Sequence, residues 1–70
     1  MFKQFLKDYR IKHNLSQLQM AELLETSQGY YSQIESGSRK PGLVIIRKLS
    51  KVIGVSEEFL RGLLWLSQIN

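Results

Sequence analysis

A short segment near the middle of the chain, residues 28–36, carries side chains that could recognise another molecule by hydrogen bonding. At the helical repeat of about 100° per residue, Tyr30, Tyr31 and Ile34 share one arc of a helix. The opposite arc is short-chained, polar and uncharged, and consists of Gln28, Gly29, Ser32 and Gln33. A glutamine amide both donates and accepts, so it can pair with an adenine edge in the major groove. The alternative is a face that is merely exposed to water, although such faces usually carry Lys and Glu.

Two capped helices and the turn between them would hold this segment in place. Ser16 is a candidate N-cap for a helix that runs through Leu24, and Ser27 is a candidate N-cap for the helix that ends near Gly37. Residues 25–26 would form the turn between them. A helix, a short turn and a second helix are the layout of a helix-turn-helix.

Helical periodicity predicts three further helices and no strand. They cover residues 2–13, residues 43–53 after Pro41-Gly42, and a segment that starts at Ser56 and ends at Gly62 or Leu66. The sequence therefore predicts an all-α, compact five-helix fold, with residues 1–70 forming a single domain. The expected core-facing side chains include Phe2, Leu6 and Tyr9 in the first helix, Met20, Ala21, Leu23 and Leu24 in the second, and Leu43, Ile45, Ile46 and Leu49 in the fourth. His13 shares the face of Phe2, Leu6 and Tyr9 and is expected to be a helix-end residue that interacts with terminal carbonyls.

Composition excludes several classes of function for this chain of 70 residues. It has no cysteine and one histidine, so we expect no metal and no cofactor. It has no Gly-rich phosphate loop and no carboxylate pair near His13, so we expect no enzyme and no small-molecule ligand. The N-terminus is charged throughout and no apolar run reaches the roughly 18 residues of a membrane span. We therefore expect a cytoplasmic protein without membrane association, whose formal charge of +4 favours a polyanionic partner.

Several motifs resemble the Cro and phage-repressor family of helix-turn-helix domains, from about Leu6 to Leu60. The matching pieces, in order and at the right spacing, are Leu15-Ser16-Gln17, Ala21-Glu22-Leu23, Ser32-Gln33-Ile34-Glu35-Ser36-Gly37, Pro41 and Ile53-Gly54-Val55-Ser56. The resemblance implies a five-helix domain that binds a two-fold operator in double-stranded DNA as a homodimer. The helix over about 28–36 would then be the recognition helix in the major groove.

The resemblance also implies contacts with the DNA backbone. Gln17, just after its helix cap, would contact a phosphate, and Arg39 and Lys40 would border the backbone from the loop before Pro41. Ser27 and Tyr30 complete the expected DNA-binding set, although Tyr30 could instead pack in the core. Gln17 could also be an ordinary exposed helix residue, and the basic loop could be merely solvated.

Two positions depart from the family pattern. Glu25 stands where the turn usually has glycine, and a non-glycine residue in a left-handed conformation costs about 1 kcal/mol. Tyr31 stands where the family usually has an aliphatic β-branched residue, so it needs more room and a partner for its hydroxyl. Both departures concern the detail of the turn and not the predicted fold.

Arg10 and Glu35 are predicted to form a structural ion pair. Glu35 lies at the C-terminal end of its helix, where the macrodipole disfavours a negative charge. Arg10 lies four residues after Leu6, near the core face of the first helix, and the resembled family pairs matching positions.

The C-terminal segment 62–70 carries more large apolar side chains than one helix face can bury. We therefore predict a dimer interface there, made by Leu63, Leu64, Trp65, Leu66 and Ile69. The alternative is that Trp65 and its neighbours fold back onto the same chain.

The function predicted from sequence is thus a sequence-specific, double-stranded-DNA-binding transcriptional regulator that acts as a repressor. The competing interpretation is a helix-turn-helix module that binds another protein, such as an antitoxin or an accessory factor. A protein-binding face should carry exposed apolar anchors, which the arc around Gln28 and Gln33 does not.

Overall fold

The computed structural model describes residues 1–69, and side chains as far as Ser67. Its elements are the helices α1 (Phe2–Lys12), α2 (Gln17–Leu23), α3 (Gln28–Ser36), α4 (Leu43–Ile53) and α5 (Glu57–Ile69). Within the described residues there is no strand, so the predicted all-α, five-helix fold is confirmed. None of these helices is both long enough and apolar enough to cross a membrane.

The helix ends follow from the capping residues in the sequence. Ser16 accepts a hydrogen bond from the backbone of Gln19, whose side chain accepts one from the backbone N–H of Ser16, a complete capping box. Ser27 caps α3 in the same way through the N–H of Tyr30. Gly37 ends α3 in the left-handed conformation, with φ of 86°, where a side chain would be strained.

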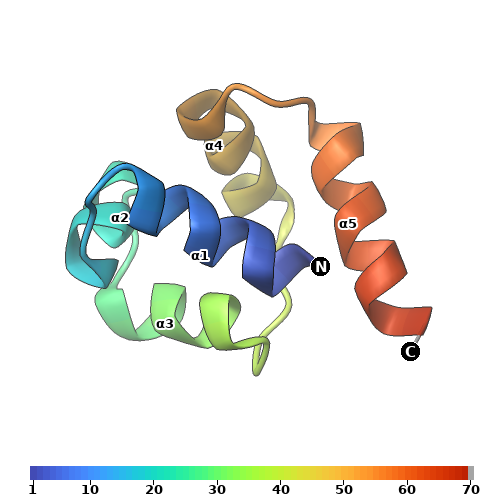
Figure 1. Cartoon of the computed structure of the whole chain (residues 1–70), viewed down its shortest axis with the longest axis horizontal. Helices are drawn as coiled ribbons and strands as arrows, with labels where there is room; N and C mark the ends of the chain where they lie inside the picture. The colour runs from blue at the N-terminus through green and yellow to red at the C-terminus, as the bar shows by residue number, and fades with distance from the viewer. Residues whose placement is uncertain (70) are drawn as a thin grey trace.

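The helices enclose one hydrophobic core. In Figure 1, α1 crosses the middle of the molecule, with α3 below it, α4 above it and α5 along one side. The largest fully buried side chains come from all five helices or their ends, and are Leu6, Met20, Leu24, Tyr31, Ile34, Ile46, Leu49 and Leu60. The hydroxyl of Tyr9 donates to the carbonyl of Val52 at 3.2 Å, which ties α1 to α4. The core therefore fixes α3 against α1 and α2, with its opposite face outward.

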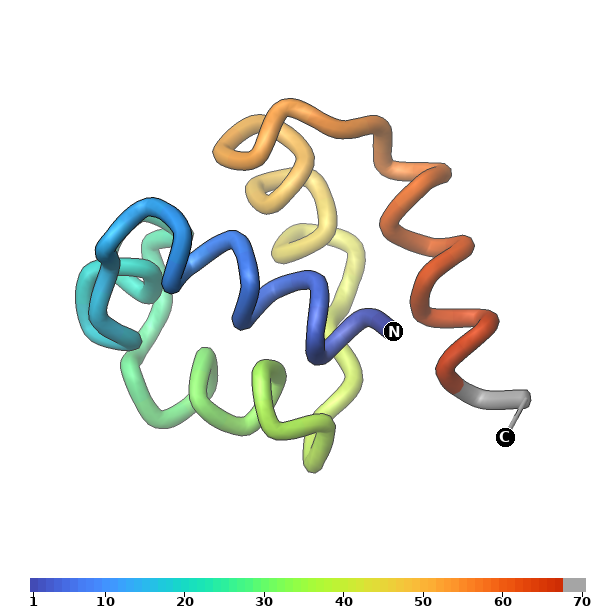
Figure 2. The backbone as a smooth tube through the Cα atoms, in the orientation of Figure 1, coloured from blue at the N-terminus to red at the C-terminus, as the bar shows by residue number. Residues whose placement is uncertain are grey.

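The chain start lies between the end of α3 and α5. The tube in Figure 2 shows the N-terminus close to both the loop that follows α3 and the second half of α5. The backbone N–H of Phe2 donates to the hydroxyl of Ser67 at 3.0 Å, and the ring of Phe2 is buried. The first residues of α1 are thereby held next to the loop over residues 37–42.

Two details of the sequence prediction are wrong because the buried arc of each helix is narrower than half a circle. Leu23 is 49% exposed, since it lies about 100° away from the centre of the arc formed by Met20, Ala21 and Leu24. Leu43 is 62% exposed for the same reason, because Ile45 and its buried neighbours define an arc on another side of α4.

His13 lies at the end of α1, where the sequence analysis expected a helix-end residue. The helix ends at Lys12, and His13 is its exposed C-cap, whose ring lies 4.2 Å from that of Tyr9. At the other end of the chain, α5 continues through Gly62, so residues 62–69 are the later turns of that helix and not a separate segment.

Candidate nucleic-acid interface

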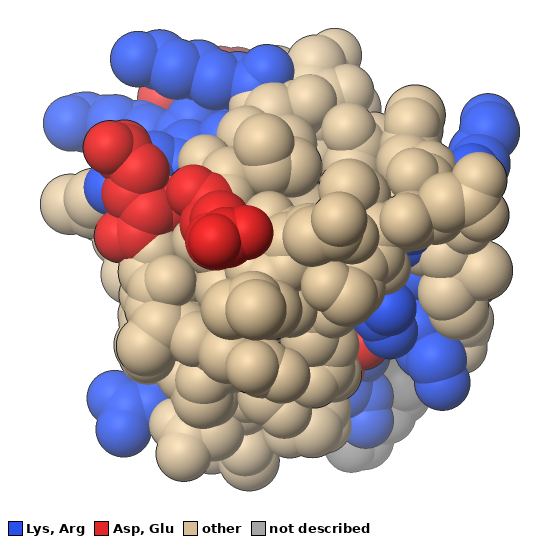
Figure 3. Space-filling model, turned by 90° about the vertical axis from the view of Figure 1, so that its left-hand side faces the viewer, with Lys and Arg blue, Asp and Glu red and all other residues tan. Residues whose placement is uncertain are grey.

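The exposed face of α3 is formed by the residues that the periodicity assigned to it. Gln28, Gly29 and Gln33 are exposed and Ser32 is half-buried, whereas Tyr31, Ile34 and Glu35 are buried. This face lies at the lower edge of the molecule in Figure 1. Most acidic surface in Figure 3 gathers in the upper part of the view, and the lower part, on the side of α3, is uncharged with Lys and Arg at its edges. On the face drawn in Figure 3, a polyanion can therefore approach the side of α3 without meeting an exposed carboxylate.

The turn before α3 explains the first departure from the family pattern. Glu25 has φ of 56°, in the left-handed region that glycine adopts more easily. Hydrogen bonds hold this turn in place. The N–H of Glu25 donates to the carbonyl of Glu22, and the N–H of Thr26 donates to the carbonyl of Ala21, which closes the end of α2. The turn thus has the geometry that glycine usually provides, and α3 leaves it at the expected place.

Contacts of Arg39 with Gln33 and Tyr30 hold the basic loop after Gly37 against α3. The guanidinium of Arg39 donates through Nε to Oε1 of Gln33 at 2.9 Å. Its central carbon lies 5.4 Å from the ring centroid of Tyr30, a cation–π distance. Tyr30 is half-buried and packs against the core, so its ring serves both the core and Arg39. Gln33, Tyr30 and Arg39 therefore form one continuous surface at the end of α3.

Glu35 is the centre of a buried hydrogen-bond network. Arg10 forms a bidentate ion pair with it. Nε donates to Oε2 at 2.8 Å and Nη2 donates to Oε1 at 2.9 Å. The hydroxyl of Tyr31 donates to Oε2 at 2.6 Å, and the amide of Gln17 donates to Oε1 at 3.3 Å. The side chains that the sequence analysis expected to pair thus lie in contact, and Tyr31 has the partner that its hydroxyl needs.

These contacts determine the protonation state of Glu35. Burial by itself would raise the pKa of the Glu35 carboxyl, but the hydrogen bonds from Arg10, Tyr31 and Gln17 outweigh it and hold the pKa below its ordinary value. Conversely, burial and the bond to Glu35 raise the pKa of Tyr31, so its hydroxyl remains a donor. At neutral pH the network contains a buried carboxylate, only 7% exposed, with donors on both oxygens.

The network links the interior to Gln17, the expected phosphate contact. Gln17 is the first residue of α2, half-buried and directed toward Glu35. Sequence reasoning placed Gln17 by the resemblance alone and missed this link. The need of the Tyr31 hydroxyl for a partner was expected from its core position, but the identity of that partner, Glu35, was not.

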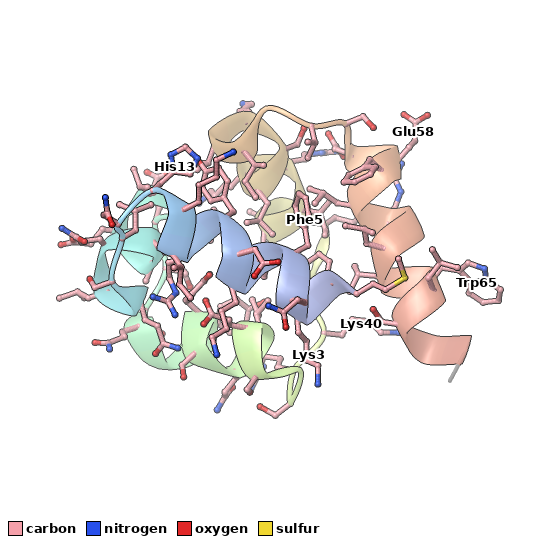
Figure 4. All side chains as sticks on the ribbon, in the orientation of Figure 1. Lys3, Phe5, His13, Lys40, Glu58 and Trp65 are labelled. Atoms are coloured by element: carbon pink, nitrogen blue, oxygen red, sulfur yellow. The ribbon has the colours of Figure 1, made fainter. Side chains whose placement is uncertain are left out.

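The predicted dimer residues divide into two groups. Leu63 and Leu64 pack against the core of their own chain. Trp65 is 64% exposed and Leu66 is 44% exposed, and both face outward from α5. Figure 4 shows Trp65 directed away from the rest of the molecule. The side chain of Ile69 lies outside the described residues.

Comparison with known proteins identifies the class. The model of a helix-turn-helix family, of the Cro/C1 type, matches residues 6–60, so the chain belongs to this family of DNA-binding transcriptional regulators. This confirms the resemblance seen in the sequence.

The curated relatives carry the same general description. The chain is 30% identical over 54 residues to the uncharacterised HTH-type transcriptional regulator YqaF of Bacillus subtilis, covering 77% of this chain and 71% of that protein. It is 38% identical over 60 residues to the SPbeta prophage-derived uncharacterised regulator YonR of the same organism, covering 86% and 56%. A regulator of Mycobacterium tuberculosis is 36% identical over 56 residues, covering 80% and 40%. The chain thus spans only part of each relative. No solved structure matches it significantly.

Proposed function

We propose that this protein recognises a specific duplex DNA sequence by inserting α3 into the major groove. The observation that supports this most directly is the outward face of α3, which is uncharged and is followed by the exposed cations Arg39 and Lys40. Gln28 has no intramolecular partner among the hydrogen bonds of the described residues, so both functions of its amide are open to a base edge. Ser32 and Gln33 extend the same face by one helical turn.

The DNA backbone would be held on both sides of α3. On one side the Gln17 amide, which has a second N–H besides the one bonded to Glu35, would donate to a phosphate together with the first backbone N–H groups of α2. On the other side Arg39 and Lys40 are both exposed in the loop after α3. Phosphate contacts position the protein and base contacts give the sequence preference, so the two groups of residues have separable effects on binding.

The proposed active form is a homodimer assembled through α5. One recognition helix reads only a few base pairs, whereas two on a symmetric dimer reach major grooves about 34 Å apart and multiply the specificity. Trp65 and Leu66 form the exposed apolar surface that such a contact requires. Gly62 lies one turn before them, with nothing within 4 Å of where its β-carbon would stand. Because glycine weakens a helix by about 0.5–1 kcal/mol relative to alanine, its presence in α5 favours a close approach by the partner chain there.

Occupancy of a two-fold operator by this dimer would exclude other proteins from the same DNA, which is repression in its simplest form. This proposed mode of action requires neither a metal ion nor a catalytic step.

The decisive experiment selects bound duplexes from a random DNA pool and then measures affinity for the selected site. Recovery of a two-fold consensus, with affinity that falls as salt rises, supports the proposal. Pool members bound without any shared sequence, or no duplex binding at low salt, would instead favour the protein-interaction module. Matched titrations of the double variant Arg39→Ala/Lys40→Ala should show weaker binding to every duplex. The slope of the logarithm of affinity against the logarithm of salt concentration should become shallower by about 0.9 for each phosphate that is no longer neutralised.

A further inference from the structure

Lys3, at the start of α1, lies against the end of α3. A β-carbon placed on Gly37 would collide with Cδ of Lys3 and would lie 3.3 Å from both Cγ and Cε. The lysine side chain therefore crosses the glycine that ends the recognition helix, in the space left by the missing side chain. In Figure 4, Lys3 extends from α1 down to this end of α3.

The position of Lys3 is fixed by its neighbours. Phe2 is buried in the core and its backbone N–H is bonded to Ser67, so the first turn of α1 cannot shift freely. Lys3 follows directly and is exposed. A lysine stem that packs on backbone while its ammonium group reaches water is a common arrangement for this side chain.

Lys3 shares one cavity with Arg39 and Lys40. This cavity, of about 250 Å³, has an apolar lining of Phe2, Ile34, Pro41 and Leu64 and the three cations among its lining residues. No acidic residue lines it, and neither Lys3 nor Lys40 takes part in an ion pair within the described part of the chain. Three cationic side chains that line one cavity without an acidic residue favour an anion as the partner.

We infer that Lys3 is a third phosphate contact, which joins Arg39 and Lys40 in holding the DNA backbone at the end of α3. This inference rests on the proposed function, since it assigns a further residue to the same DNA-binding surface. Lys3 lies before residue 6, where the match to the family model begins, so the family pattern does not assign this role. The absence of a side chain at Gly37 then has two consequences, because it ends α3 and leaves room for Lys3 beside the backbone-binding loop.

The expected effect follows from counterion release. Each phosphate neutralised on B-DNA contributes about 0.9 to the slope of the logarithm of affinity against the logarithm of salt concentration. Removing the charge of Lys3 should therefore lower that slope by about 0.9 per bound subunit. Since this contribution vanishes near 1 M salt, the affinity at 0.1 M salt should fall by a factor of about 10 to the power 0.9, roughly eightfold per subunit.

The experiment compares Lys3→Gln with Lys51→Gln by titration of the full chain with the selected duplex between about 0.05 and 0.3 M salt. Lys51 is an exposed lysine near the end of α4, a helix on the opposite side of α1 from α3 in Figure 1, so its replacement removes the same charge away from the surface. Lys3→Arg keeps the charge and should retain the wild-type slope. Thermal unfolding of each variant checks that the fold is intact.

The outcomes separate this inference from the proposed function. A lower slope for Lys3→Gln, with Lys51→Gln and Lys3→Arg near wild type, supports the assignment. If Arg39→Ala/Lys40→Ala lowers the slope and Lys3→Gln does not, the DNA-binding function stands and the role of Lys3 is refuted. An equal decrease of the slope for Lys3→Gln and Lys51→Gln would mean that only the net charge of the protein matters, and would also refute the role of Lys3. If the wild-type chain binds no duplex, the proposed function itself fails.

Discussion

Replacing Tyr31 with phenylalanine removes one hydroxyl group from the centre of the fold and leaves the fully buried ring in place. The hydrogen bond that disappears, 2.6 Å to Oε2 of Glu35, has a charged acceptor. Bonds of that kind contribute about 1.5–3 kcal/mol. Because Oε2 keeps the donor Nε of Arg10, we expect the lower limit, about 1.5 kcal/mol. For a domain of this size that corresponds to a melting temperature lower by roughly 6–12 °C.

The penalty should depend on pH, and its sign follows from the pKa of Glu35. Hydrogen bonds hold that pKa below its ordinary value in the folded chain, so the unfolded chain takes up the proton first as pH falls. The stability from the network is therefore present at neutral pH and is lost as pH falls through the folded pKa. Without the Tyr31 hydroxyl the pKa of Glu35 rises, and the difference between wild type and Tyr31→Phe should narrow below about pH 4.

Urea and thermal unfolding followed by circular dichroism at several pH values would test this reasoning. Tyr9→Phe is the matched control, since it removes a hydroxyl bonded to the neutral carbonyl of Val52 and its smaller penalty should not change in the acid range. A Tyr31→Phe protein as stable as wild type at pH 7, or a stability difference that widens in acid, would refute the argument that the hydroxyl acts on a buried carboxylate.

Four further predictions concern the same structure. A double-mutant cycle of Arg10→Met and Glu35→Gln, followed by urea unfolding, should give a coupling of more than about 1 kcal/mol, and additive effects would exclude the ion pair as a stabilising unit. Gln28→Ala should cost about 1–3 kcal/mol on the selected site and relax its base preference, whereas uniform weakening on all duplexes would count against base readout. Gly62→Ala should raise the stability of the monomer by about 0.5–1 kcal/mol and yet weaken self-association, measured by sedimentation; a gain in both would place the dimer contact elsewhere. Trp65→Ser should weaken self-association more than about tenfold and leave monomer unfolding nearly unchanged, and equal dimer strength would refute a role for this side chain.

Most of the fold could be predicted from local signals in the sequence. Ser16, Ser27, Gly37 and Gly54 mark helix ends through bonds or conformations that involve only neighbouring residues, so their effect does not depend on the rest of the fold. The boundaries of α2, α3 and α4 follow within a residue or two. Burial was less predictable, and Leu23 and Leu43 show why, since the width of a buried arc depends on how closely neighbouring helices approach.

The candidate site divides in the same way. The uncharged face of α3 could be derived from periodicity, because the residues on one side of a single helix are set by its repeat. The contacts that organise it could not, since they join residues far apart in the chain. Arg39 folds back over Tyr30 and bonds to Gln33 only because the loop after Gly37 reverses direction.

The sequence by itself therefore determined the five helices, their caps and the polar face of α3, because each depends on residues within one or two turns of one another. Only the tertiary structure decided which distant groups meet. It placed the Tyr31 hydroxyl, Arg10 and Gln17 around one carboxylate, since that network exists only when α1, α2 and α3 pack together. It also brought Lys3 to Gly37, because the chain start is held between α3 and α5 by the buried ring of Phe2 and its bond to Ser67, contacts that no local pattern encodes.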